Sequence, residues 1–211
     1  MKLIGMLDSP YVRRVAICLQ LMGVRFEHQS LSVFRTFDQF RQLNPVVKAP
    51  TLLADDGTVL MDSTLILQYA EALAAPSRRM TPAEPEKLLR SLRVLSLALA
   101  ACEKSVQIVY EHNLRPAEKL HEPWLERVKL QLLSALDGLE EAFRNHPPTL
   151  GAGMHHGEVM AAVLWHFLEQ MVPDVFSVAS YPLLAEYSRQ AEALPEFTAA
   201  PHGDGTYVWK N

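Results

Sequence analysis

The chain has 211 residues, of which 49% are hydrophobic, so it is long enough for one large or two small domains, and its composition excludes a disordered protein. Its net charge of −4 provides no broad basic field, which argues against nucleic acid as a partner. No stretch is long and apolar enough to span a bilayer, so we expect no membrane partner either.

The chain contains two cysteines, Cys18 and Cys102, and both fall within apolar helical patterns. A small buried thiol is the expected role there, and the sequence supports no framework of disulfide bonds. The hydrophobic run Met1–Leu7 is too short for a signal peptide and ends at Asp8. We therefore expect a soluble protein of the reducing cytoplasm.

The first elements alternate between strand and helix. Residues 2–7 predict a short buried strand, and a helix follows with Ser9 placed to cap it and Pro10 at its first position. Residues 24–29 alternate like a strand that is exposed on one face. The irregular segment 31–43 predicts a loop and a short helix.

Residues 44–61 predict a hairpin that can present a ligand. Proline cannot donate a hydrogen bond to a strand ladder, so Pro50 belongs at a strand start or, as we expect for Ala49–Pro50, in a cis turn. Either position leaves the N–H and C=O groups of Ala49 unpaired within the sheet. An extended peptide can pair with them.

A further helix is predicted from Ser63 to about Ala74. Ser63 is expected to be its N-cap, at a helix end whose free amides attract a carboxylate. With this helix, residues 1–75 have the order β-α-β-α-β-β-α, which is that of an α/β, thioredoxin-like domain.

A change in composition marks the domain boundary. Residues 76–85 contain three prolines and predict a linker. Beyond it no strand pattern appears, so residues 86–211 predict an all-α helical bundle domain. Its helices are expected at about 86–113, 125–143, 159–168 and 183–194.

Three pieces of the first domain carry a family resemblance: the run Asp8-Ser9-Pro10-Tyr11-Val12-Arg13-Arg14, the pair Ala49-Pro50 and the pair Asp62-Ser63. In this order and spacing they resemble the glutathione-binding half of the cytosolic glutathione S-transferase superfamily. The run at Ser9 is similar to the motif of serine-type members, in a bacterial subgroup of undefined function. The α/β domain followed by a helical domain extends the resemblance over nearly the whole chain.

The resemblance implies a function and a set of roles. Glutathione is the implied co-substrate, and its thiolate attacks a small apolar electrophile, as in detoxification, or reduces an organic hydroperoxide. Ser9 is the implied catalytic residue, which donates a hydrogen bond to the thiolate. The implied glutathione-binding residues are Ser9, Tyr11, Lys48, Ala49, Pro50, Asp62 and Ser63.

Each role has a plainer alternative. Ser9 alone is more often a helix cap, and only its context favours catalysis. Tyr11 either supports Ser9 and lines the substrate pocket or is a half-buried helix residue. Lys48 either pairs with the glycyl carboxylate of glutathione or is an exposed loop charge, and Arg35 is a weaker candidate for the same carboxylate. Arg14 is expected to solvate a helix face or to bond a loop carbonyl, as is its neighbour Arg13.

The helical domain offers fewer candidates. Tyr110 and Trp165 are possible walls of the electrophile pocket, although core packing is the more ordinary role for Trp165. The pair His155-His156 cannot direct both rings to one metal, and no cysteine or carboxylate stands at zinc-ligand spacing, so we expect no metal. The family usually caps its buried helix with a Ser or Thr and an Asp, whereas this chain has His155 and Glu158. We therefore expect a less stable helix start.

Two other functions compete with the transferase. A glutathione-dependent thiol–disulfide reductase needs a cysteine at the helix start, where this chain has Ser9, and the motif of the related maleylacetoacetate isomerases is absent. A non-catalytic glutathione-binding or regulatory protein with the same fold stays open. The resemblance also implies a homodimer, and Leu89, Leu97 and Ile108 are expected to lack partners within their own bundle. The sequence does not identify the electrophile.

Overall fold

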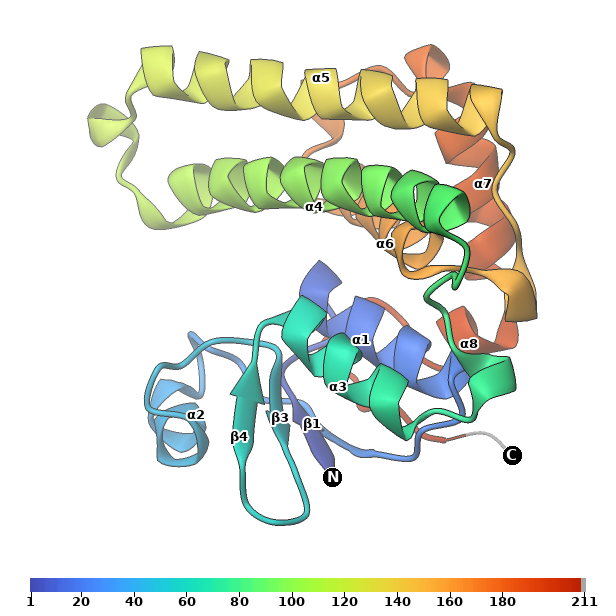
Figure 1. The fold of residues 1–211 in the computed structure, drawn as a ribbon. Helices are drawn as coiled ribbons and strands as arrows, with labels where there is room; N and C mark the ends of the chain where they lie inside the picture. Colours follow the sequence, from blue (N-terminus) through green and yellow to red (C-terminus); the bar gives the residue numbers. More distant parts are fainter. Residues whose placement is uncertain (210–211) are drawn as a thin grey trace. The chain divides into compact units, whose positions relative to one another are not determined.

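The computed structural model describes residues 1–209, and the chain divides into two compact units. The N-terminal unit consists of residues 1–81, 151–153 and 192–209, and the helical unit of residues 82–150 and 154–191. Figure 1 follows the chain through both. Among the described residues, no helix is long and apolar enough to cross a membrane.

The N-terminal unit is built on a mixed sheet with the strand order β2-β1-β3-β4. β1 is parallel to β2 and antiparallel to β3, which pairs in turn with β4. Helices α1 and α3 lie side by side (Figure 1). The elements are β1 (Lys2–Ile4), α1 (Pro10–Leu21), β2 (Glu27–Gln29), α2 (Phe37–Leu43), β3 (Thr51–Leu53), β4 (Val59–Met61) and α3 (Ser63–Leu73). This order confirms the predicted thioredoxin-like fold.

The helical unit is an all-α bundle, as predicted. Its longest helices, α4 and α5, pack against each other, and α6 packs against α4. The close approach of α6 depends on Gly157, because a Cβ atom there would lie 2.8 Å from backbone atoms of Ser91 and Leu95. The main helices are α4 (Pro85–Leu114), α5 (Glu122–Asn145), α6 (His156–Met171) and α7 (Pro182–Glu192).

The predicted extent of the helical domain, 86–211, requires a correction. Residues 192–209, with the short helix α8 (Pro195–Thr198), pack with the N-terminal unit instead. The reason is local: the ring of Tyr207 stacks on Phe26 with a centroid distance of 4.6 Å, and the buried Arg13 of α1 takes its partners from this segment. Lys210 and Asn211 lie outside the described residues.

The residues chosen from the sequence as a dimer surface also require a correction. Ile108 is fully buried within the helical unit, and the side chain of Leu97 lies over Gly138 of α5. Both therefore have partners in their own bundle. Only Leu89, which is 71% exposed, fits the expectation.

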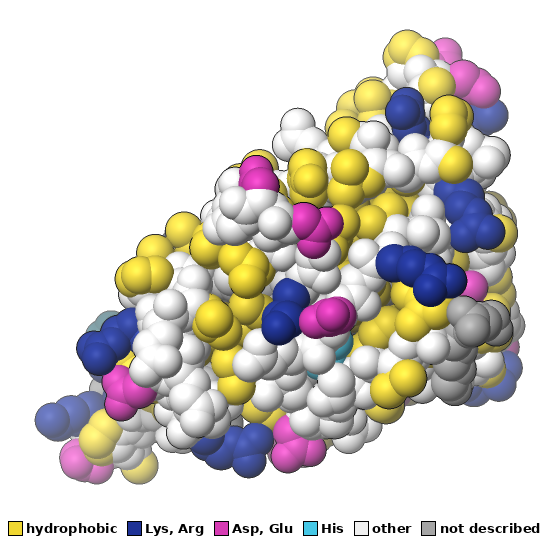
Figure 2. Space-filling model, turned by 90° about the horizontal axis from the view of Figure 1, so that it is seen from below, with side chains coloured by type: hydrophobic (Ala, Val, Ile, Leu, Met, Phe, Trp, Pro, Cys, Tyr) yellow, Lys and Arg dark blue, Asp and Glu magenta, His cyan; other side chains and the backbone are white. Residues whose placement is uncertain are grey.

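The surface carries mixed charge. On the described part of the face drawn in Figure 2, Lys and Arg side chains stand singly between acidic and apolar ones. They form no continuous basic area on that face, in agreement with the small net charge of the chain.

Candidate functional site

The first part of the site is the start of α1. Ser9 is the N-cap, with extended backbone geometry, and its Oγ accepts a hydrogen bond from the Val12 N–H at 3.5 Å. This distance is at the outer limit for a hydrogen bond, so the cap interaction is weak. Within residues 1–209 the Ser9 hydroxyl donates to no acceptor, which leaves its proton for a ligand.

The second part is the loop before β3. The Ala49–Pro50 peptide bond is cis, as the sequence predicts. No described residue forms a hydrogen bond with the N–H or C=O group of Ala49, or with the ammonium group of the exposed Lys48. The loop therefore presents two backbone groups and one cation that a peptide ligand can use.

The third part is the start of α3, where one prediction was wrong. Asp62, not Ser63, is the N-cap: its Oδ1 accepts a hydrogen bond from the Thr64 N–H at 2.8 Å. Asp62 adopts a left-handed φ of 71°. Ser63 is the first helical residue and is buried.

Two contacts join these three parts. A Cβ atom at Gly5 would lie 2.7 Å from Val12 Cγ2 and 3.1 Å from Ala49 Cβ, so the first turn of α1 and the cis-proline loop meet at this glycine. From α1, the buried Arg14 guanidinium donates a hydrogen bond from Nη1 to Ser63 Oγ at 3.0 Å. Ser9, Ala49 and Ser63 thus belong to one connected region of the N-terminal unit.

The arginines depart from the predicted surface roles. Arg13 and Arg14 are both buried, so neither solvates a helix face. Arg13 does bond a loop carbonyl as expected: its Nε donates to the Ala200 oxygen at 2.7 Å.

Arg35 is exposed and lies 3.6 Å from the Asp204 carboxylate. Burial raises the pKa of the neighbouring Asp8, while its hydrogen bond with the Ser9 backbone and the charge of Arg35 act in the opposite direction.

The remaining candidates differ in exposure. Tyr11 is half-buried on α1, as both of its predicted roles allow. Tyr110 is 44% exposed on α4 of the helical unit. Trp165 is 1% exposed, with its ring edge-to-face against Phe176 at 5.1 Å. Trp165 therefore has the core-packing position, the more ordinary of its two predicted roles.

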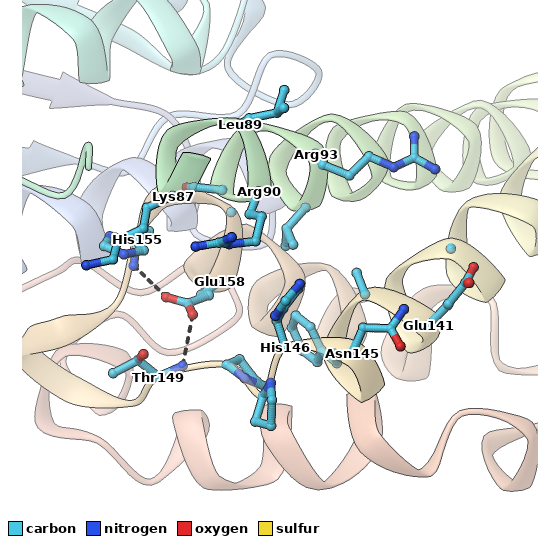
Figure 3. Close-up of a pocket in the computed structure, with 18 residues that line it drawn as sticks. Lys87, Leu89, Arg90, Arg93, Glu141, Asn145, His146, Thr149, His155 and Glu158 are labelled. Atoms are coloured by element: carbon cyan, nitrogen blue, oxygen red, sulfur yellow. Dashed lines mark hydrogen bonds between the residues drawn. The ribbon is translucent and has the colours of Figure 1, made fainter. Parts of the chain in front are cut away.

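The helical unit contains a cavity of about 500 Å³ that neither Tyr110 nor Trp165 lines. Its lining includes Arg90 and Arg93 of α4 and Asn145, the last residue of α5 (Figure 3).

Glu158 lies at one end of this cavity. It accepts hydrogen bonds from the backbone N–H groups of Thr149 and His155, at 2.8 and 2.7 Å (Figure 3). Glu158 therefore takes the place of the missing Asp at the start of α6, and both of its oxygen atoms stabilise the turn that leads into the helix.

The residues that hold the cis-proline loop are not among those predicted from the sequence. Asn44 and Thr51 are both buried, and Asn44 Nδ2 donates a hydrogen bond to Thr51 Oγ1 at 2.8 Å. The available signal was an Asn-Pro pair directly before the loop, because asparagine side chains commonly bond to the backbone two residues ahead. No group of three metal-ligating side chains occurs among residues 1–209.

Comparisons with known proteins agree with this geometry. A profile of the glutathione S-transferase N-terminal domain matches residues 3–78. An uncharacterized GST-like protein of Escherichia coli K12, YibF, is 33% identical over 141 residues, which cover 66% of this chain and 68% of YibF. Glutathione S-transferase U7 of Arabidopsis thaliana is 37% identical over 70 residues, or 31% of its own length.

Solved structures extend the similarity to nearly the full chain. A glutathione S-transferase of Methylobacterium radiotolerans, in complex with glutathione sulfonate, has a TM-score of 0.85 at 27% identity, covering 94% of this chain and 93% of that one. A glutathione transferase family member of Pseudomonas fluorescens, with bound S-(propanoic acid)-glutathione, has a TM-score of 0.78 at 27% identity, with coverage of 95% and 98%. By sequence match, fold and site geometry, this chain belongs to the glutathione S-transferase family.

Proposed function

We propose that this protein binds glutathione in the N-terminal unit and joins the glutathione, through its sulfur atom, to a small electrophile. The observation that carries the proposal is the set of unused polar groups in one connected region. These are the Ser9 hydroxyl proton and the two backbone groups of Ala49, and the start of α3 lies in the same region. The bound glutathione derivatives of similar structures support glutathione as the ligand.

In this proposal each part of glutathione has its own partner. The backbone of its cysteine pairs with Ala49, beside Pro50. Its γ-glutamyl end lies at Asp62 and Ser63, where free helix N–H groups and the nearby Arg14 guanidinium favour a carboxylate. Its glycyl carboxylate pairs with Lys48, and Tyr11 lines the site.

The chemistry requires a thiolate. A free thiol has a pKa of about 8.5, so at neutral pH the site must stabilise the anion. Ser9 supplies a hydrogen bond from its hydroxyl group, and the N-terminus of α1 supplies partial positive charge. The thiolate then attacks an electrophilic carbon, displacing a leaving group or adding to a carbon–carbon double bond. With an organic hydroperoxide it attacks an oxygen atom, the O–O bond breaks and the alcohol is released, and a second glutathione converts the resulting sulfenic acid to glutathione disulfide and water.

The burial and positions of the two cysteines favour glutathione transfer, rather than disulfide reduction, as the activity. Cys18 and Cys102 are both fully buried, and burial raises the pKa of the Cys18 thiol to about 12. Such a thiol is neither ionised nor accessible, and neither cysteine stands at the start of α1.

The test combines binding with turnover. Glutathione should bind the purified protein in calorimetry, and a panel of aryl halides, unsaturated carbonyls and organic hydroperoxides should reveal glutathione-dependent turnover. Binding without turnover of any class would favour the non-catalytic, regulatory function. Absence of binding would refute the proposal.

We also propose that the protein is a homodimer. Leu65, Tyr69 and Leu73 follow one another at four-residue spacing along α3, and they are 53%, 38% and 47% exposed. They form an apolar row that a second copy can cover. A monomeric mass in light scattering at micromolar protein concentration would contradict this proposal.

A further inference from the structure

A chain of hydrogen bonds that runs through the side chains of Asn44 and Thr51 holds the cis-proline loop. The Asn44 side chain is 2% exposed and Thr51 is fully buried. The Val46 N–H donates to Asn44 Oδ1 at 3.0 Å, which fixes the orientation of the amide and leaves Nδ2 as the donor to Thr51 Oγ1. The hydroxyl proton of Thr51 then goes to the carbonyl oxygen of Lys48, at 2.7 Å.

The loop needs this support. Val47 adopts a left-handed φ of 52°, which is unfavourable for a β-branched residue and persists only where surrounding contacts hold it. Its own N–H donates to the Asn44 carbonyl oxygen at 2.9 Å. Asn44 therefore holds Val46 and Val47 directly, and it holds Lys48 through Thr51.

The backbone groups of the loop differ in whether they have a hydrogen-bond partner within the protein. Hydrogen bonds within the protein occupy three of them: the Val46 N–H, the Val47 N–H and the Lys48 carbonyl. Both backbone groups of Ala49, by contrast, have no partner in the described chain. The bonds made by Asn44 and Thr51 thus determine which groups of the loop are left to face a ligand.

We propose that Asn44 and Thr51 are positioning residues for glutathione: they set its affinity by holding Lys48 and Ala49 in the binding geometry before the ligand arrives. This inference rests on the proposed function. Neither side chain touches the ligand, because both are buried. Preorganisation of this kind lowers the dissociation constant by reducing the ordering that binding requires.

The test compares two substitutions at one position. Thr51→Val keeps the shape of the side chain but removes the hydroxyl, whereas Thr51→Ser keeps the hydroxyl. We expect Thr51→Val to raise the Kd and KM for glutathione about tenfold, and Thr51→Ser to stay within roughly twofold of wild type. The kcat at saturating glutathione should change less than about threefold in both variants, because the chemistry at Ser9 is untouched.

Hydrogen exchange without ligand separates positioning from general stability. In Thr51→Val the Val46 and Val47 amides should exchange faster, while the amides of β3 and β4 keep wild-type rates. Equal acceleration in the strands, or an unchanged Kd, would overturn the inference.

Asn44→Asp provides a second variant if Thr51→Val does not fold. Its carboxylate still accepts from the Val46 N–H but cannot donate to Thr51, so the same rise in Kd is expected, and an unchanged Kd would again overturn the inference. If the wild-type protein itself does not bind glutathione, the proposed function fails, and this inference fails with it. Wild-type binding with an unaffected Thr51→Val variant overturns the inference alone.

Discussion

Arg13 and Glu192 form a two-pronged ion pair across 179 residues of sequence: Nη1 and Nη2 of the arginine each donate to one carboxylate oxygen at 2.6 Å. Arg13 is 2% exposed, and its guanidinium also lies over the Phe197 ring at 5.8 Å. The pair fastens the segment that starts at Glu192, the last residue of α7, to α1, the helix that Ser9 caps.

Removing the charge of Glu192 should destabilise the protein. In Glu192→Gln the buried Arg13 guanidinium loses its counter-charge, and we expect the free energy of unfolding to fall by about 2 to 4 kcal/mol. Urea denaturation measures this change. A matched control is Glu186→Gln, which breaks an Arg–Glu pair of the same 2.6 Å length on the surface of α7, where the loss should stay below about 1 kcal/mol. Equal losses in the two variants would contradict the argument.

The sequence predicts those parts of the fold that depend on local pattern. The apolar spacing of Leu95, Cys102 and Val106 predicts α4 to within a residue or two at each end, because a long amphipathic helix repeats the same signal many times. Pro50 predicts the cis turn, and Ser9 with Pro10 predicts the start of α1, because each depends on the chemistry of one or two residues.

The parts that escaped prediction depend on contacts distant in sequence or on a choice between two adjacent caps. Arg13 has the pattern of a surface residue until Glu192 and the Ala200 carbonyl are beside it. Asp62, not Ser63, caps α3, and because both residue types are preferred N-caps the adjacent pair does not decide between them. Local sequence patterns thus predict where the helices and strands lie, whereas the partners of buried polar side chains can be identified only in the folded structure.

Because of its left-handed φ, Val47 should tolerate replacement by glycine better than replacement by alanine. The usual order of stability for these two substitutions is the reverse. Val47→Gly and Val47→Ala lose nearly the same packing, but only alanine keeps the cost of a left-handed φ, so the glycine variant should be more stable by about 1 kcal/mol. At the neighbouring Val46, whose φ is not positive, alanine should be the more stable of the two. Thermal unfolding of the four variants tests the reversal, and the same order at both positions would refute it.

Acidification should loosen the attachment of the C-terminal segment through His28. His28 Nδ1 accepts a hydrogen bond from the Tyr207 N–H at 2.8 Å, and Nε2 bonds the Gly5 carbonyl at 2.7 Å, so the neutral ring satisfies both. Burial lowers the pKa of His28 below its ordinary value of 6.5, with the Gly5 hydrogen bond acting in the opposite direction. A proton on Nδ1 would face the Tyr207 N–H and break that bond.

The sign of the pH effect follows from the lowered pKa. Between the folded pKa and 6.5 the unfolded chain binds more protons, so the contribution of His28 to stability is complete above 6.5. It is lost as the pH falls towards the folded pKa. Free energies of unfolding measured from about pH 7.5 to about pH 5.5 should therefore decline less steeply in His28→Gln than in wild type. Parallel declines would show that His28 does not contribute.

The last prediction concerns Ser9, whose hydroxyl the proposed chemistry requires. Because its cap bond to Val12 is 3.5 Å long, Ser9→Ala should cost less than about 1 kcal/mol of stability. Loss of the hydrogen bond to the thiolate should, however, raise the pKa of bound glutathione by about one to two units. Turnover at neutral pH should then fall about tenfold and recover partly as the pH rises, because the thiol ionises without help.

Ser9→Cys should instead form a mixed disulfide with glutathione and gain disulfide-reductase activity while losing conjugation. Ultraviolet absorbance of the bound thiolate, measured across pH in wild type and Ser9→Ala, reports the shift directly. An unchanged titration and pH–rate profile would reduce Ser9 to a helix cap and leave Tyr11 as the remaining hydroxyl candidate on α1.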